Sequence, residues 1–192
     1  ASISVGYKTD YQMYSMDFEE FLWAKGYQEQ VISDMLEHML SGAPFSASEQ
    51  NTFSNLFLEY CILGGMPAIV SNYIAKGTFE GSLQLQRQLL TDYENDIIKY
   101  AEGLDKAKIL SVYRSIPAQL AKENKKFQYA MIQKGARASV FGESIDWLLN
   151  ARLVLKCDKT TRGDVPPNMY VDISAFKIYM SDEYLSLIHI SE

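Results

Sequence analysis

The sequence predicts a mainly α-helical protein with a small β component. Apolar residues recur at helical spacing through most of the first hundred positions. Further on, a tight turn joins two helical segments, and two strand-like segments follow over 152–158 and 176–182, connected by the Gly- and Pro-rich stretch TTRGDVPPN. Helices followed by a two-stranded ribbon is the order of a winged helix-turn-helix. With 192 residues and 47% hydrophobic content, the chain is long enough to bury a core.

Two helices are predicted near the N-terminus. In the first, over 16–26, Asp17 and Glu20 have the spacing of a capping box, and Gly26 suits the position after the helix end. The second spans 27–40, and we expect its methionines to fill the core because they belong to an apolar face made of Val31, Ile32, Met35, Leu36 and Met39. A loop is predicted over 41–51. Before these helices, alternating apolar and polar residues over 7–13 predict a short strand.

A helical hairpin and a long helix are predicted next. Over 53–77, Gly64 and Gly65 separate two helices, and Pro67 lies in the first turn of the second, where a missing amide costs little. The long helix, over 79–102, is expected to bury Leu83, Leu90, Tyr93, Ile97 and Ala101. Acids spaced two apart point to different sides of a helix, so we expect a solvated face rather than a carboxylate site from Asp92, Glu94, Asp96, Glu102 and Asp105.

The pattern changes near Gly103, where we predict a domain boundary. A helix over 105–121 is expected to be interrupted or bent at Pro117. A short helix over 127–134 and a longer one over 139–151 follow. The longer helix is expected to bury Phe141, Ile145, Leu148 and Leu149 and to expose Ser139, Glu143, Asp146 and Asn150.

Several classes of site are excluded by composition. Cys61 and Cys157 lie far apart without a CxxC pattern, which favours buried thiols over a disulfide or a zinc site. His38 and His189 are the only histidines and suggest no catalytic triad, so we predict no catalytic residue and no metal site. No apolar run approaches the roughly 20 residues that span a bilayer, and no signal peptide is visible. We therefore expect a cytoplasmic protein without a membrane partner.

One basic stretch stands out. Residues 122–137, KENKKFQYAMIQKGAR, carry a net charge of +4 in a chain of net charge −6, so the remainder sums to −10. Together with the predicted wing, it supplies eight candidate nucleic-acid-binding residues: Lys122, Lys125, Lys126, Lys134, Arg137, Lys156, Lys159 and Arg162. The following helix would expose two acids and no base, so we expect weak, salt-dependent contacts to the DNA backbone that do not read sequence. Phe127 and Tyr129 are predicted to be core residues, with stacking on a base as the alternative.

Five segments, in this order and spacing, resemble the prokaryotic AAA+ family of predicted ATPases with a C-terminal domain of unknown function. They are MDFEEFLWAKG, LGGMPAIV, DYENDIIKYAE, SIPAQLAKENKKFQYAMIQKGARASVFGESIDWLLNARLVLKC and FKIYMSD. The resemblance runs from about Asp10 to Asp182. It implies that 1–16 end an ATPase core, 17–77 form a helical lid, 78–103 a connecting helix, 104–182 a winged helix domain, and 183–192 a truncated or non-native tail.

The resemblance also implies a function. The chain would be the lid and winged-helix segment that couples ATP binding and hydrolysis, in a core outside this chain, to a partner such as DNA. ATP and Mg²⁺ are expected in that core; no GxxxxGK[ST] occurs here, so we expect no cofactor in this chain. Two alternatives stay open. One is a standalone, nonenzymatic winged-helix regulator, and the other is a docking module for a protein partner or a homo-oligomer, favoured by the net charge of −6.

Overall fold

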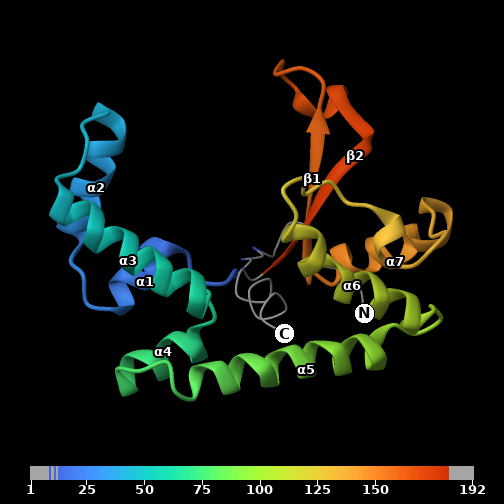
Figure 1. The fold of residues 1–192 in the computed structure, drawn as a ribbon, viewed down its shortest axis with the longest axis horizontal. Coiled ribbons are helices and arrows are strands. Elements are labelled where there is room, and N and C mark those ends of the chain that lie inside the picture. The colour runs from blue at the N-terminus through green and yellow to red at the C-terminus, as the bar shows by residue number, and fades with distance from the viewer. Residues whose placement is uncertain (1–8, 10, 12, 182–192) are drawn as a thin grey trace.

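The computed structural model describes residues 9, 11 and 13–181. The predicted tail over 183–192 and most of the predicted strand over 7–13 lie outside these residues. The described part is mainly helical and contains a two-stranded antiparallel sheet, as predicted. Helices α1 to α4 gather at one end and the sheet lies with α6 and α7 at the other, while the long α5 runs along the base between them (Figure 1). Within the described residues, no helix combines the length and apolarity needed to cross a bilayer.

Helix α1 (Phe18–Ala24) begins at the predicted capping box. The Glu20 amide donates to Asp17 Oδ1 at 2.8 Å, and the Asp17 amide donates to Glu20 Oε2 at 2.9 Å. Gly26 follows the helix in a left-handed conformation, with φ of 89°. Phe21 and Leu22 are buried, and through this face α1 packs against α3 and α4. The capping residues therefore set the start of the helix, and its apolar face places it.

Helix α2 (Glu29–Ser41) corrects one sequence prediction. Met39 is 71% exposed and Leu36 is 46% exposed, so they do not fill the core; Ile32 is buried and Met35 is half-buried. The rest of the described chain covers only part of the apolar face of α2. Helical periodicity identified this face correctly, but it carries no information about which part is covered.

Helix α3 (Ala47–Leu63) begins inside the predicted loop. Ser46 and Glu49 form a second capping box, in which the Glu49 amide donates to Ser46 Oγ at 3.3 Å and the Ser46 amide donates to Glu49 Oε2 at 2.9 Å. The predicted loop over 41–51 is therefore too long. The first turns of α3 are exposed and polar, which made them resemble a loop in the sequence.

The Gly64-Gly65 break between α3 and α4 (Pro67–Lys76) occurs where predicted, with Pro67 in the first turn. Gly65 is required by a close approach of the chain before α1. The Met16 amide donates to the Gly65 carbonyl at 2.7 Å, and a Cβ atom on Gly65 would lie 2.1 Å from the Met16 carbonyl oxygen. Tyr60 donates its hydroxyl to the same Met16 oxygen at 2.9 Å. These contacts fix the segment before α1 to the end of α3.

Helix α5 (Ser82–Tyr100) buries a glutamine where a leucine was expected. Leu83 is 46% exposed, whereas Gln86 is fully buried. The side-chain amide of Gln86 donates to the carbonyls of Ile62 and Leu63, at 2.8 and 3.0 Å, near the end of α3. Carbonyls at a helix end have no intrahelical donor, so a buried amide is more useful there than another apolar group. The predicted burial of Ile97 and Ala101 further along is confirmed.

The second half begins with α6 (Lys106–Leu120), which continues through Pro117 to Leu120. The predicted short helix over 127–134 is wrong, because only a three-residue 3-10 turn, η1 (Tyr129–Met131), forms there. Helix α7 (Ala138–Asn150) matches its predicted bounds to within one residue and buries Phe141, Ile145 and Leu148 as expected.

Strand β1 keeps its predicted length but begins two residues later, and β2 is longer than predicted. Strand β1 (Val154–Thr160) pairs antiparallel with β2 (Val171–Met180), from Val154 opposite Met180 to Thr160 opposite Val171. The register shifts between Asp158 and Lys159. A loop and a second 3-10 turn, η2 (Pro167–Tyr170), connect the strands at the tip. The resulting β-ribbon, defined as β1 and β2, rises away from α5 (Figure 1).

Candidate nucleic-acid interface

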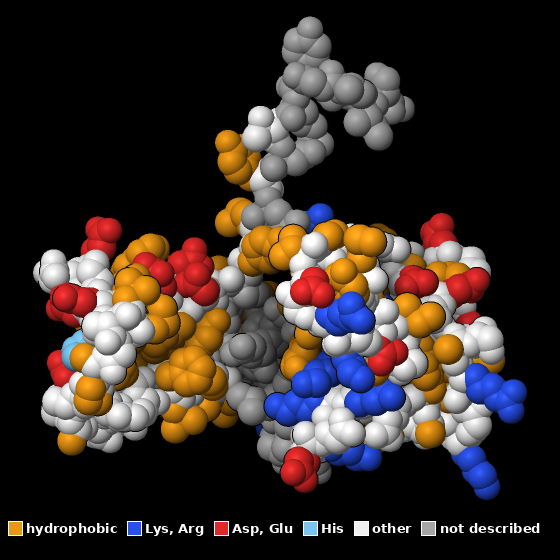
Figure 2. Space-filling model, turned by 90° about the horizontal axis from the view of Figure 1, so that it is seen from above, with side chains coloured by type: hydrophobic (Ala, Val, Ile, Leu, Met, Phe, Trp, Pro, Cys, Tyr) orange, Lys and Arg blue, Asp and Glu red, His pale blue; other side chains and the backbone are white. Residues whose placement is uncertain are grey.

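Charge is divided unevenly along the chain. Residues 104–181 contain thirteen Lys and Arg against seven Asp and Glu, whereas residues 1–103 contain five Lys and Arg against fourteen Asp and Glu. The net charges are therefore +6 and −9. Most of the Lys and Arg side chains visible from above lie on the half that holds the β-ribbon (Figure 2). The negative total hides a basic half, to which a polyanion would be attracted.

The connector between α6 and η1 carries three of the predicted lysines, Lys122, Lys125 and Lys126, all exposed. Two hydrogen bonds donated by backbone amides hold the connector in place. The Phe127 amide donates to the Phe176 carbonyl at 2.9 Å, and the Gln128 amide donates to Gln119 Oε1 at 2.7 Å. The connector is thus fixed between β2 and α6.

Phe127 and Tyr129 belong to the packed interior of this half. Phe127 is 5% exposed, and its ring stacks on Phe176 with centroids 5.4 Å apart. Tyr129 is half-buried and meets the Phe127 ring edge-on at 5.3 Å. Burial raises the pKa of Tyr129, and the nearby charge of Lys156 partly opposes this rise. The prediction of core residues is confirmed, and Phe127 has no free face on which a base could stack.

The β-ribbon has two distinct faces because side chains alternate along a strand. On the inner face, Val154, Lys156 and Asp158 lie opposite Met180, Ile178 and Phe176. Val154, Ile178 and Met180 are buried there. Lys156 Nζ lies 2.7 Å from Asp158 Oδ1 and 4.9 Å from the centre of the Phe176 ring. The charge of Lys156 is therefore largely matched within the ribbon.

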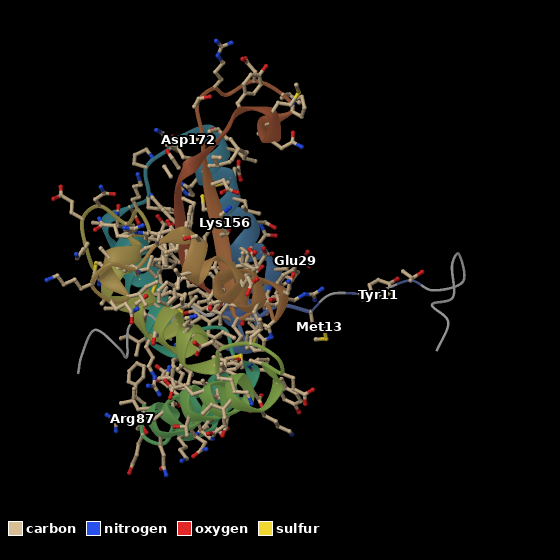
Figure 3. The ribbon with its side chains drawn as sticks, turned by 90° about the vertical axis from the view of Figure 1, so that its right-hand side faces the viewer. Tyr11, Met13, Glu29, Arg87, Lys156 and Asp172 are labelled. Atoms are coloured by element: carbon tan, nitrogen blue, oxygen red, sulfur yellow. The ribbon has the colours of Figure 1, made fainter. Side chains whose placement is uncertain are left out.

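Lys159 and Arg162 lie further toward the ribbon tip. Lys159 Nζ lies 3.3 Å from Asp172 Oδ2, and Arg162 lies over the Tyr170 ring at 5.9 Å. Hydrogen bonds from the Ser174 hydroxyl and amide, followed by Lys159, hold the pKa of Asp172 below its usual value. In Figure 3, Asp172 lies nearer the ribbon tip than Lys156 does. The two tip cations are thus offset by local acids and aromatic contacts.

The outer face of the ribbon consists of Leu155, Cys157, Lys177 and Tyr179, in which Leu155 pairs with Tyr179 and Cys157 with Lys177. Lys177 is exposed and forms no ion pair with any residue that the structure describes. It was missed as a candidate in the sequence because only the strand register reveals which face it occupies. Phe176, which precedes Lys177 in β2, accepts the hydrogen bond from the Phe127 amide of the connector.

Lys134 and Arg137 lie in the turn before α7 and are exposed. The predicted outward residues of α7 are exposed as well: Ser139, Glu143, Asp146 and Asn150. They include two acids and no base. All eight predicted basic residues are therefore on the surface, but they occupy three places: the connector, the turn before α7 and the ribbon.

The described residues contain no group of three His, Cys, Asp or Glu side chains placed to hold a metal ion. The acids Asp92, Asp96, Glu102 and Asp105 are exposed, as predicted for a solvated face, whereas Glu94 is half-buried and pairs with Arg114. Neither Cys61 nor Cys157 forms a disulfide among these residues, and the prediction that both are buried is wrong for Cys157, which is exposed on the outer face of the ribbon.

Comparison with known proteins identifies a family. A family model described as a domain of unknown function (DUF8612) matches residues 54–187, from the middle of α3 to beyond β2. The matched span contains more than two thirds of the chain, including all the basic residues discussed above. No curated protein and no solved structure matches the chain.

Proposed function

This chain belongs to the DUF8612 family of domains of unknown function, and we propose that its residues 104–181 form a winged helix that binds the DNA backbone. Binding is weak and indifferent to sequence. The order of α6, η1, α7 and β-ribbon supports this, because a winged helix-turn-helix places its helices and wing in the same order. The 3-10 turn η1 takes the place of its second helix.

The division of charge carries the proposal. DNA presents one negative charge per roughly 1.7 Å of duplex, so a half with net charge +6 is attracted to it while the half with −9 is repelled. This polarity orients the chain with its basic half toward the backbone. The exposed acids of α7, Glu143 and Asp146, disfavour insertion of that helix into the major groove. Contacts to phosphates without contacts to bases give affinity without sequence preference.

The resemblance to AAA+ proteins adds a role for the first half, as a lid that passes the nucleotide state of a core outside this chain to the DNA-binding half. A continuous set of contacts supports such coupling. The Met16 amide hydrogen-bonds to the Gly65 carbonyl, and the Gln86 side chain hydrogen-bonds to the end of α3. Glu94 on α5 forms an ion pair with Arg114 on α6. A displacement of the chain before α1 can therefore be transmitted through these contacts to α6.

A protein-docking function is the second candidate, and one observation favours it. Leu36, Met39 and Leu40 form an exposed apolar stripe on α2, in the acidic half. An exposed apolar stripe of this kind is typical of protein interaction surfaces. It lies on the opposite half from the basic residues, so the two functions are compatible in one chain.

The experiment compares two charge-reversal variants in a DNA-binding titration with a short labelled duplex at low salt. The first replaces Lys125, Lys126 and Lys134 with Glu; the second replaces Lys76, Arg87 and Lys99, which are exposed in the acidic half, and changes the net charge equally. We expect the first to weaken binding at least about tenfold and the second to have a much smaller effect. Equal losses in both variants, or no binding by the wild type, would contradict the proposal.

A further inference from the structure

Exposed lysines with no ion pair among the described residues lie in the connector and on the outer face of the β-ribbon. Phe127 and Phe176 stack ring on ring and share a backbone hydrogen bond, so their side chains occupy the interior side of the sheet. Along extended chains the neighbouring side chains point the opposite way. Lys177, next to Phe176 in β2, therefore projects on the outer side, and Lys126 is exposed in the connector, one residue before the Phe127 amide that bonds to β2.

Two candidates on the ribbon are less available to a phosphate. Lys156 is on the inner face and pairs with Asp158, and Lys159 pairs with Asp172. The conventional reading surface, the exposed side of α7, presents Glu143 and Asp146. A duplex placed on α7 would meet these two carboxylates, and a duplex placed on the outer face would meet Lys126 and Lys177.

We propose that DNA lies along the outer face of the β-ribbon and the connector, and that α7 does not enter the groove. The ligand chemistry is the phosphodiester backbone of a duplex. Lys177, with Lys122, Lys125 and Lys126, supplies the cations, while the outer-face residues Leu155 and Tyr179 pack beside them. This inference rests on the proposed DNA binding and specifies the side of the molecule that performs it.

Cys157 offers a direct test, because this thiol is exposed on the outer face opposite Lys177. In a Cys61→Ser background, Cys157 is conjugated to an iron chelate that generates hydroxyl radicals, and cleavage of an end-labelled duplex is mapped. The matched probe carries Cys157→Ser and Ser139→Cys, which moves the chelate to the exposed side of α7. Circular dichroism confirms that both probes fold. We expect strand cleavage from Cys157 to be several-fold stronger than from position 139.

Point variants provide a second readout that needs no chelate. Lys177→Glu is expected to weaken duplex binding as much as Lys126→Glu does, whereas Glu143→Lys on α7 is expected to leave affinity within about twofold of wild type, because only groups near phosphates change the electrostatic binding term. Stronger cleavage from position 139, or a several-fold gain of affinity in Glu143→Lys, overturns the outer-face assignment while DNA binding itself stands. Absence of duplex binding by the unmodified chain instead overturns the proposed function.

Discussion

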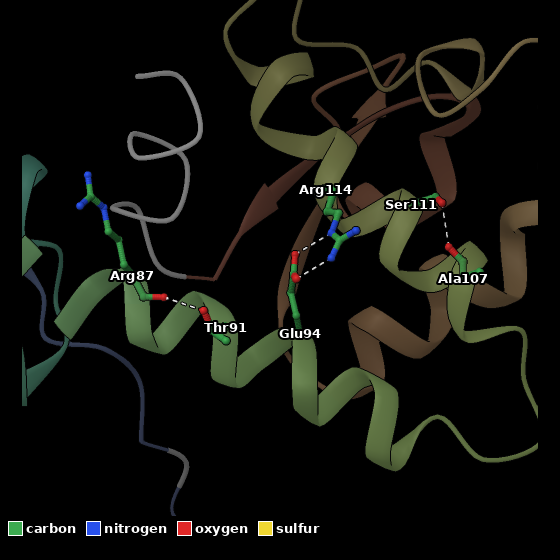
Figure 4. Close-up of polar contacts among 6 residues, drawn as sticks. All are labelled: Arg87, Thr91, Glu94, Ala107, Ser111 and Arg114. Atoms are coloured by element: carbon green, nitrogen blue, oxygen red, sulfur yellow. Dashed lines mark hydrogen bonds and ion pairs between the residues drawn. The ribbon is translucent and has the colours of Figure 1, made fainter. Parts of the chain in front are cut away.

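Arg114 on α6 donates two hydrogen bonds to the carboxylate of Glu94 on α5. Arg114 Nε donates to Glu94 Oε1 at 2.7 Å, and Nη2 donates to Oε2 at 2.6 Å (Figure 4). The planar guanidinium fits the carboxylate edge to edge, which a lysine cannot do. Hydrogen bonding to Glu94 raises the pKa of Arg114 further above its usual value, so the guanidinium keeps its charge. This pair joins the long helix to the basic half.

Arg114→Lys should therefore lower the free energy of unfolding slightly. The pair is solvent-accessible, with 56% of the Arg114 side chain and 26% of the Glu94 side chain exposed, so we expect a loss of about 0.5–1 kcal/mol in urea unfolding at low salt. Arg87→Lys is the control, because Arg87 lies exposed on α5, the helix of Glu94, and is absent from the ion pairs of the described residues. A loss of the same size in both variants would show that the two-point geometry contributes nothing.

Gly65→Ala should be severely destabilising. The added Cβ would meet the Met16 carbonyl oxygen at 2.1 Å, so the segment before α1 must move and its hydrogen bond with Gly65 must be lost. We expect at least about 2–3 kcal/mol of lost stability, as for other backbone clashes. Gly142→Ala in α7 is the matched control, since nothing lies within 4 Å of its Cβ position, and it should stabilise by about 0.5–1 kcal/mol. Chemical denaturation measures both, and a neutral Gly65→Ala would refute the close approach.

Gln86→Ala should also destabilise the chain. The substitution leaves the carbonyls of Ile62 and Leu63 without their buried donor, which costs about 1–3 kcal/mol. Gln88→Ala on the same helix removes only an exposed hydrogen bond to Asp92 and should stay within about 0.5 kcal/mol of wild type. If thermal unfolding ranks the two variants equally, the buried bonds of Gln86 do not hold α3 to α5.

The ribbon tip should contribute a pH-dependent term. The pKa of Asp172 is lowered chiefly by the Ser174 hydroxyl and amide, so its ionised form is favoured in the folded state. That stability is present above the unfolded pKa of about 3.9 and is lost as the pH falls through the lower folded value. Ser174→Ala should consequently be less stable than wild type at pH near 7, and the difference should shrink below about pH 4. A stability difference independent of pH would contradict this linkage.

Local signals in the sequence were sufficient wherever a helix boundary depends on neighbouring residues. Asp17 and Glu20 predicted the start of α1, and Gly64 with Pro67 predicted the break before α4. The same type of signal, Ser46 with Glu49, was overlooked because it lies among polar residues that resemble a loop. The capping pattern of Ser46 and Glu49 therefore predicts the start of α3 better than the polar composition around it.

Other features depend on tertiary contacts and have no local signal. Gln86 is buried because the end of α3 lies against it, and no periodicity distinguishes it from the exposed Leu83. Residues 127–134 contain only a 3-10 turn, and the Phe127 amide at their start donates to the Phe176 carbonyl of β2, a contact that periodicity does not predict. Lys177 could be identified as a candidate site residue only once the register of β1 and β2 was known.

The proposed role of the basic half is to hold the DNA backbone through phosphate contacts alone. It is tested most directly by measuring the affinity of the chain for two duplexes of unrelated sequence between about 50 and 200 mM salt. We predict equal affinities for the two sequences and a steep fall of both affinities with salt. For four lysine contacts, a plot of log K against log salt concentration should have a slope of about −3 to −4. Affinity that is insensitive to salt, or strong preference for one duplex, would contradict it.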